Sequence, residues 1–233
     1  MPSRLPTIFI PALLCDDMLY RDVIAVLGDA IEPQVMISPK ASLADSVADI
    51  LARAPRTFAL VGTSYGANLA LAIALAAPER VLSLWLMGCD ASAPVAGGTD
   101  LAAALEATPE AIIDLLAGIV VRPADHAASA AFKAMANRVG APAGAAQARA
   151  QASRDDIWSR LGELRMPALI LSGDEDPVAP PVCGRQLAQA MPHARFELMT
   201  QCGHLPSLEQ PLRAAALFHA FLGEHAPCES GQL

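Results

Sequence analysis

Three residue types that act together in nucleophilic catalysis occur along this chain: a serine, a carboxylate and a histidine. Ser64 is the centre of Gly62-Thr63-Ser64-Tyr65-Gly66, a G-x-S-x-G pattern. Asp176 lies in an acidic segment after one apolar run, and His204 follows a later apolar run. A serine hydroxyl needs a base to remove its proton, and the base needs an acid to orient it. Each feature alone also fits an ordinary loop, but together they predict a catalytic triad.

The spacing of the two glycines around Ser64 has a steric reason. A serine at a sharp turn from strand to helix is forced into a backbone conformation with positive φ. Strand and helix then approach closely, and only small residues fit two positions before and two positions after the serine. Such a turn aims the amino end of the next helix at the reaction centre. We therefore expect the Tyr65 N–H to stabilise a developing oxyanion.

The chain alternates between short apolar runs, which are typical of strands, and longer runs with helical periodicity. The predicted strands are residues 8–10, 33–37, 57–61, 81–87, 168–171 and 195–198. The predicted helices are residues 16–27, 43–54, 65–77, 182–190 and 210–222. This order predicts an α/β fold with a mostly parallel sheet and helices on both faces. The carboxyl edge of such a sheet is where ligands bind, and the three candidate catalytic residues all follow predicted strands.

Composition excludes several other functions. The net charge is −8 and only 4% of the 233 residues are aromatic, which argues against a nucleic-acid partner. No apolar run is long enough to span a membrane. The five cysteines form no C-x-x-C pair, so we expect no structural zinc and no disulfide framework, and a cytoplasmic location. We find no motif for a metal or organic cofactor and expect none.

The sequence resembles the α/β-hydrolase superfamily over nearly its whole length, as a small serine carboxylesterase-like member. Residues 61–66 look like the nucleophile elbow of the family, and residues 203–204, with Glu209 and Pro211, look like its histidine loop. Residues 173–177 look like its acid loop, in which the family places the acid three residues after the glycine, at Asp176. Some members instead carry the acid where this chain has Asp90, so that residue stays an alternative. The missing amino-terminal hairpin implies about six strands.

The resemblance also indicates where the second oxyanion donor lies. Residues 10–16 are similar to the segment that carries His-Gly in the family, with Pro11-Ala12 in its place. The second backbone N–H would then come from Leu13, with Leu14 as the alternative.

An alanine-rich segment, residues 91–154, interrupts the alternation of strands and helices. We predict that it forms several short helices, and that these form a cap on a hydrolase core of residues 1–90 and 155–233. Five basic residues but only one acid, Asp125, lie within residues 118–154. A solvated helix face would explain this excess; the alternative is a landing surface at Arg138 and Arg149 for an anionic substrate or an acyl carrier.

The resemblance implies hydrolysis of a small carboxylic ester through an acyl-enzyme intermediate. Other uses of the same triad stay open: cleavage of a C–C bond, of a thioester or of an ester linked to an acyl carrier. A member that binds a ligand in the same pocket without catalysis is a further alternative. The sequence does not indicate the natural substrate or the oligomeric state.

Overall fold

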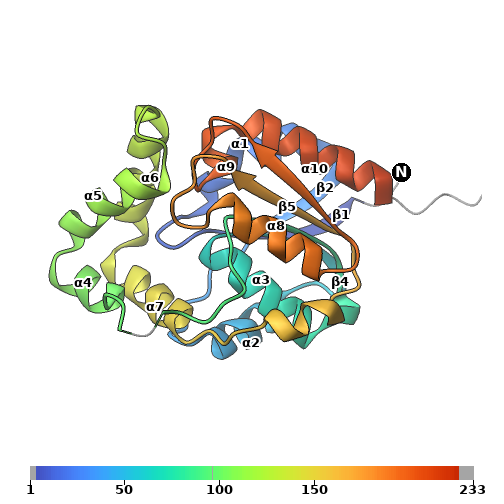
Figure 1. The fold of residues 1–233 in the computed structure, drawn as a ribbon, viewed down its shortest axis with the longest axis horizontal. Helices are drawn as coiled ribbons and strands as arrows, with labels where there is room; N and C mark the ends of the chain where they lie inside the picture. Colours follow the sequence, from blue (N-terminus) through green and yellow to red (C-terminus); the bar gives the residue numbers. More distant parts are fainter. Residues whose placement is uncertain (1–3, 96, 226–233) are drawn as a thin grey trace, which may run out of the picture.

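Six parallel strands form the centre of the molecule (Figure 1). The computed structural model describes residues 4–95 and 97–225. The strands lie in the order β2-β1-β3-β4-β5-β6, and every neighbouring pair is parallel. Their bounds are β1 Leu5–Ile10, β2 Ile31–Val35, β3 Phe58–Thr63, β4 Val81–Met87, β5 Ala168–Gly173 and β6 Ala194–Met199. The predicted fold class and strand number are therefore confirmed.

Helices cover both faces of this sheet. One face carries α1 (Arg21–Leu27) and α10 (Pro211–His225), and the other carries α2 (Leu43–Arg53), α3 (Tyr65–Ala76) and α8 (Pro181–Ala190) (Figure 1). Because the sheet is covered on both sides, β3 is buried along its whole length and shows no alternation of polar and apolar residues. The Ser42 side chain begins α2 by accepting the Asp45 N–H at 3.1 Å.

Several predicted elements differ from the structure in their bounds: β1 begins three residues earlier than the predicted strand 8–10, and β3 and β5 each end two residues later than predicted. Two further differences concern the first helix and the second strand. The helix expected over residues 16–27 is divided into a 3₁₀ turn at Asp17–Leu19 and α1, because the backbone of Tyr20 between them is not helical, with φ −112° and ψ 0°. The Tyr20 hydroxyl donates to the Ile10 carbonyl at 2.9 Å. The strand expected over residues 33–37 begins and ends two residues earlier. Its parallel pairing with β1, which aligns Ile31 with Leu5, sets these bounds, and local β propensity does not.

Four helices lie between β4 and β5, in the segment where the alternation was expected to stop. They are α4 (Leu101–Ala107), α5 (Pro109–Val120), α6 (His126–Val139) and α7 (Ala141–Ala152), and we call them the inserted helices. Asp100 and Asp125 cap α4 and α6 by accepting backbone N–H groups. In Figure 1 α4, α5 and α6 project to one side of the sheet. The 3₁₀ segment Trp158–Glu163 leads back to β5.

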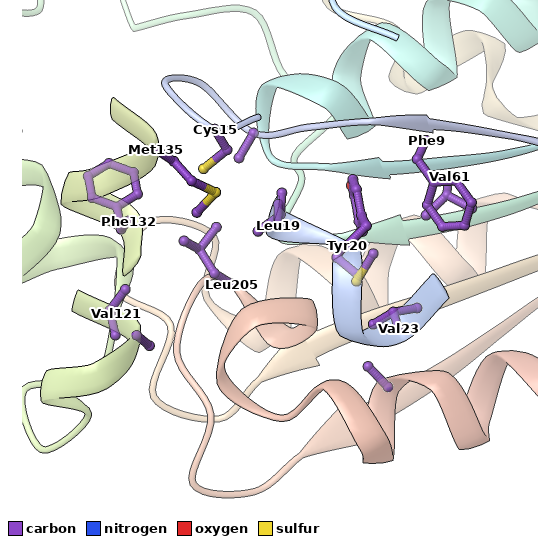
Figure 2. Packing of buried hydrophobic residues seen from close by; sticks show 14 of the residues in the cluster. Phe9, Cys15, Leu19, Tyr20, Val23, Val61, Val121, Phe132, Met135 and Leu205 are labelled. Carbon is purple, nitrogen blue, oxygen red and sulfur yellow. The ribbon is translucent and has the colours of Figure 1, made fainter. Parts of the chain in front are cut away.

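The inserted helices share a hydrophobic core with the sheet. Figure 2 shows Phe132 and Met135 of α6 on the same side as Cys15 and Leu205, and all four belong to one buried cluster. In the same cluster, the ring of Trp85 in β4 stacks on the ring of Phe218 in α10, with 4.3 Å between the ring centroids. In the described part of the chain, every helix is too short or too polar to cross a membrane.

Candidate active site

Ser64 occupies a strained turn between β3 and α3. Its φ is 55° and its ψ is −119°, a backbone conformation that residues other than glycine rarely adopt. A Cβ on Gly62 would overlap the Gly66 carbonyl, and a Cβ on Gly66 would overlap the Ile10 carbonyl. Both glycines are thus required by close backbone approach, as the spacing in the sequence predicted. The Ser64 N–H donates to the Met87 carbonyl of β4 at 2.8 Å, which holds the turn against the sheet.

His204 and Asp176 form a buried pair. The Nδ1 atom of His204 lies 2.8 Å from Oδ2 of Asp176, and the two side chains are 2% and 0% exposed. The other carboxyl oxygen accepts the Val178 and Ala179 N–H groups at 2.8 and 3.0 Å. The carboxylate is therefore held from both sides, and it fixes the orientation of the imidazole.

The end of β4 brings this pair to Ser64. The His204 ring packs against Gly88, where an added Cβ would lie 2.8 Å from Nδ1. The preceding residue, Met87, accepts the Ser64 N–H. Ser64 and His204 thus contact consecutive residues at the carboxyl edge of the sheet. The His204 Nε2 atom is buried and has no hydrogen-bond partner among residues 4–95 and 97–225. The imidazole therefore has one nitrogen held by Asp176 and one available for a proton.

Asp90, the alternative acid, has different partners. Its Oδ1 accepts the N–H and the hydroxyl of Ser92 at 3.0 and 2.9 Å. It also lines a cavity of about 220 Å³ between α2 and α3, together with Asn68 and Arg154. In the described structure the hydrogen-bonded partner of His204 Nδ1 is Asp176 and not Asp90.

Within the loop of residues 11–15, the two candidate oxyanion donors, the Leu13 and Leu14 N–H groups, differ in their hydrogen bonding. The Cys15 N–H donates to the Ala12 carbonyl at 3.0 Å, and Leu14 has a φ of 62° within this turn. The Leu14 N–H already donates to Oε1 of Gln147 in α7 at 2.9 Å. The Leu13 N–H has no such partner in the described ranges, and the Tyr65 N–H, at the first turn of α3, lacks an intrahelical acceptor. Gln147 was missed in the sequence, where nothing links it to a residue 133 positions away.

Glu209 holds the loop that carries His204. Its carboxylate accepts the N–H groups of Gly203 at 3.0 Å and Leu205 at 3.1 Å, one on each side of the histidine. It also accepts the Arg122 N–H, at 3.2 Å, from the segment between α5 and α6. Burial raises the pKa of Glu209, and these amide bonds act in the opposite direction. The sequence pointed to Glu209 only as part of the loop pattern.

Comparison with known proteins agrees with this architecture. The family described as "alpha/beta hydrolase fold" matches residues 38–211, which is more than half of the chain. The chain belongs to the α/β-hydrolase family. Among solved structures, a thermophilic esterase from Thermogutta terrifontis superposes with a TM-score of 0.86 at 21% identity, covering 97% of this chain and 92% of that one. An enol-lactonase from Burkholderia xenovorans superposes with a TM-score of 0.84 at 18% identity, covering 94% and 92%. At these identities the likeness shows the fold.

Curated relatives of this α/β-hydrolase carry different names. A 2-hydroxymuconate semialdehyde hydrolase from Pseudomonas putida is 33% identical over an alignment of 174 residues, which covers 71% of this chain. The match spans 62% of the length of that relative. A pimeloyl-[acyl-carrier protein] methyl ester esterase from Nitrosomonas europaea is 26% identical over an alignment of 194 residues, which covers 76% of this chain and 76% of that one.

Basic residues of the inserted helices are paired with carboxylates in this α/β-hydrolase. Arg138 bonds to Asp16 at 2.7 Å, and Arg149 bonds to Glu106 at 2.7 Å. Lys133 pairs in the same way with Asp114. An anionic partner at Arg138 or Arg149 would therefore compete with a carboxylate of the chain itself, and the landing surface stays a prediction.

Proposed function

We propose that this α/β-hydrolase cleaves small carboxylic esters through an acyl-enzyme intermediate, with Ser64 as nucleophile, His204 as base and Asp176 as orienting acid. The observation that carries the proposal is the buried His204–Asp176 pair, whose imidazole has an unpartnered Nε2 and packs on Gly88, next to the Met87 carbonyl that accepts the Ser64 N–H. The 91–154 segment, as a cap, would limit the access of substrate and water to this edge.

The chemistry follows from this arrangement. The His204 Nε2 atom accepts the hydroxyl proton as the Ser64 oxygen attacks the carbonyl carbon of the ester. The carbonyl oxygen becomes an oxyanion, which accepts hydrogen bonds from the N–H groups of Tyr65 and Leu13. The alcohol leaves with the proton from His204. Water then adds to the acyl group with His204 again as base, and the acid is released with the serine regenerated.

The test uses p-nitrophenyl acyl esters and a fluorophosphonate probe on the wild type and Ser64→Ala. We expect the wild type to turn over an ester and to gain the mass of one phosphonyl group. Ser64→Ala should lose both properties while its unfolding curve stays the same. Turnover by Ser64→Ala would refute the nucleophile, and a wild type that neither hydrolyses esters nor reacts with the probe would support a ligand-binding member without catalysis.

A second candidate is cleavage of a C–C bond with the same triad. The observation that favours it is the relative named for 2-hydroxymuconate semialdehyde, a compound that contains no ester. Comparing kcat/KM for p-nitrophenyl esters with that for a vinylogous diketone distinguishes the two candidates. A diketone preferred by tenfold or more would replace the ester proposal.

An ester linked to an acyl carrier is favoured by the Nitrosomonas europaea relative. If this chain takes such a substrate, charge reversal at Arg138 and Arg149 should raise KM for a carrier-linked ester and leave KM for a neutral ester unchanged. Equal effects on KM for both esters would contradict a landing surface at Arg138 and Arg149.

A further inference from the structure

We infer that Gln147, a residue of inserted helix α7, is a positioning residue for the oxyanion hole and couples this helix to catalysis. The inference rests on the proposed function, because it assigns a task to a residue through the Leu13 N–H. Gln147 contacts neither Ser64 nor His204 through any hydrogen bond in the described ranges. Its effect would pass through the backbone of the 11–15 loop.

The first step of the argument is the state of Gln147 itself. This polar side chain is 2% exposed and lies on the buried face of α7, among glycine and alanine residues. A buried amide is costly unless its polar atoms are bonded. Its Oε1 accepts the Leu14 N–H at 2.9 Å, and that bond joins two segments of the chain that are far apart in sequence.

The second step is the conformation that this bond holds. Leu14 has a φ of 62° in the turn closed by Cys15 and Ala12. A leucine at such a position is strained, since turns of this kind usually place glycine or asparagine there. The strain persists only where the surroundings over-determine the conformation. The bond from Gln147 to the Leu14 N–H is one such constraint.

Gly144, one turn before Gln147 on α7, supplies the other constraint. A Cβ at Gly144 would overlap the end of the Leu14 side chain, which is fully buried. The helix therefore receives the leucine side chain at Gly144 and its backbone N–H at Gln147. Together the two residues constrain the side chain and the backbone N–H of Leu14.

The third step concerns the amides of the loop. With the Leu14 N–H engaged by Gln147 and the Cys15 N–H by the Ala12 carbonyl, the loop amides without a partner among the described residues are those of Ala12 and Leu13. Of these two, Leu13 is the donor that the family resemblance indicates. The loop begins against the elbow, because the Ile10 and Pro11 carbonyls abut Gly66. Gln147 thus engages one candidate donor, the Leu14 N–H, and leaves the Leu13 N–H free to bind an oxyanion. An oxyanion donor needs this preorganisation to act in the transition state.

The experiment compares kcat and KM for Gln147→Met, Gln147→Glu and Gly144→Ala with the wild type, on the p-nitrophenyl ester that it hydrolyses best. Gln147→Met removes the acceptor at similar length, whereas Gln147→Glu keeps an oxygen for the Leu14 N–H. We expect Gln147→Met to lower kcat by about tenfold to a hundredfold. This loss should not exceed the loss of kcat caused by removing an oxyanion donor itself. KM should change by less than about twofold, and Gln147→Glu should regain most of the lost kcat.

A second readout is binding of a trifluoromethyl ketone, which forms a tetrahedral oxyanion with an active serine. Its inhibition constant should rise in Gln147→Met by the same factor as kcat/KM falls. Gly144→Ala disturbs Leu14 without touching Gln147, and we expect it to lower kcat severalfold. The matched control is Gln151→Met, the same substitution one turn later on α7, where Oε1 has no partner among the described residues. It should keep the wild-type kcat.

Counting active sites with a fluorophosphonate separates lost chemistry from lost folded protein. An unchanged kcat per labelled site in Gln147→Met and Gly144→Ala would overturn the inference, as would a rise in KM at constant kcat. An equal loss in Gln151→Met would also overturn it. If Ser64→Ala is inactive while Gln147→Met equals the wild type, the inference fails and the proposed function stands. If Ser64→Ala keeps turnover, the proposed function itself fails.

Discussion

The two oxygens of Asp176 have separate partners, and this separation determines what an amide would do in the same place. Oδ2 lies against His204 Nδ1, while Oδ1 accepts two backbone N–H groups. An asparagine would have to keep its oxygen toward those N–H donors, so its NH₂ group would face Nδ1. The imidazole would then carry its proton on Nε2 and could not accept one from Ser64.

We therefore expect Asp176→Asn to lower kcat by about 10³–10⁴ with little change in stability. The measurement is steady-state hydrolysis of a p-nitrophenyl ester, with an unfolding curve for each variant. Asp90→Asn is the matched control, because Asp90 bonds to Ser92 instead, and its kcat should stay within about threefold of wild type. A larger loss in Asp90→Asn than in Asp176→Asn would assign the orienting role to Asp90.

The cysteines provide a second prediction at the scale of the residue. Cys15, Cys89 and Cys202 are at most 4% exposed, and burial raises the pKa of each thiol. Because a raised pKa keeps the thiol protonated at pH 8, these three residues should not react with iodoacetamide in the folded protein. Peptide mass mapping should find that Cys183, which is partly exposed, is modified before these three buried cysteines. Cys228 lies outside the described residues. Labelling of Cys15 or Cys202 before unfolding would contradict the buried site.

At the scale of the element, the contact between strand β1 and helix α3 depends on Gly66. Its position leaves no room for a Cβ, because the Ile10 carbonyl already fills that space. A backbone group cannot move aside as a flexible side chain can. Gly118, within α5, is the opposite case, since an added Cβ there would meet nothing within 4 Å.

We expect Gly66→Ala to lower the free energy of unfolding by about 1–3 kcal/mol and to reduce kcat, because the elbow must shift away from β1. Gly118→Ala should raise the free energy of unfolding by about 0.5–1 kcal/mol, since alanine favours a helix more than glycine does. Urea denaturation of both variants measures the two effects. A Gly66→Ala variant as stable as the wild type would show that the close approach is not required.

At the scale of the whole molecule, helix α10 packs on the middle of the sheet. The Phe218 ring of α10 stacks on Trp85 of β4 with an interplanar angle of 13°. Helix α10 thus stabilises β4, and the residues at the carboxyl end of β4 contact Ser64 and His204. Folding of the site therefore requires residues from both halves of the chain.

Phe218→Ala should lower the free energy of unfolding by about 3–5 kcal/mol, a large part of the 5–15 kcal/mol that a domain usually has. The control on the same helix is Leu212→Ala, at a side chain that is 69% exposed, which should change stability by less than about 0.5 kcal/mol. Urea or thermal unfolding measures both variants. Similar losses in the two variants would contradict the packing of α10 on the sheet.

The sequence alone predicted the elements whose causes are local. The glycines around Ser64 indicated the sharp turn because steric exclusion acts over a few residues, and the order of apolar runs indicated the parallel sheet. The predicted bounds of β2 were wrong because pairing with β1 sets them. The predicted single helix over residues 16–27 was wrong because the backbone of Tyr20 is not helical.

Tertiary structure alone decided which groups meet. Asp176 and Asp90 both follow predicted strands, and only the folded chain shows which of them bonds to His204. Leu13 and Leu14 are neighbours of the same residue type, and a glutamine from a distant helix distinguishes their amides. Local patterns carry no information about such pairs, because a hydrogen bond between distant segments depends on how the helices and strands pack.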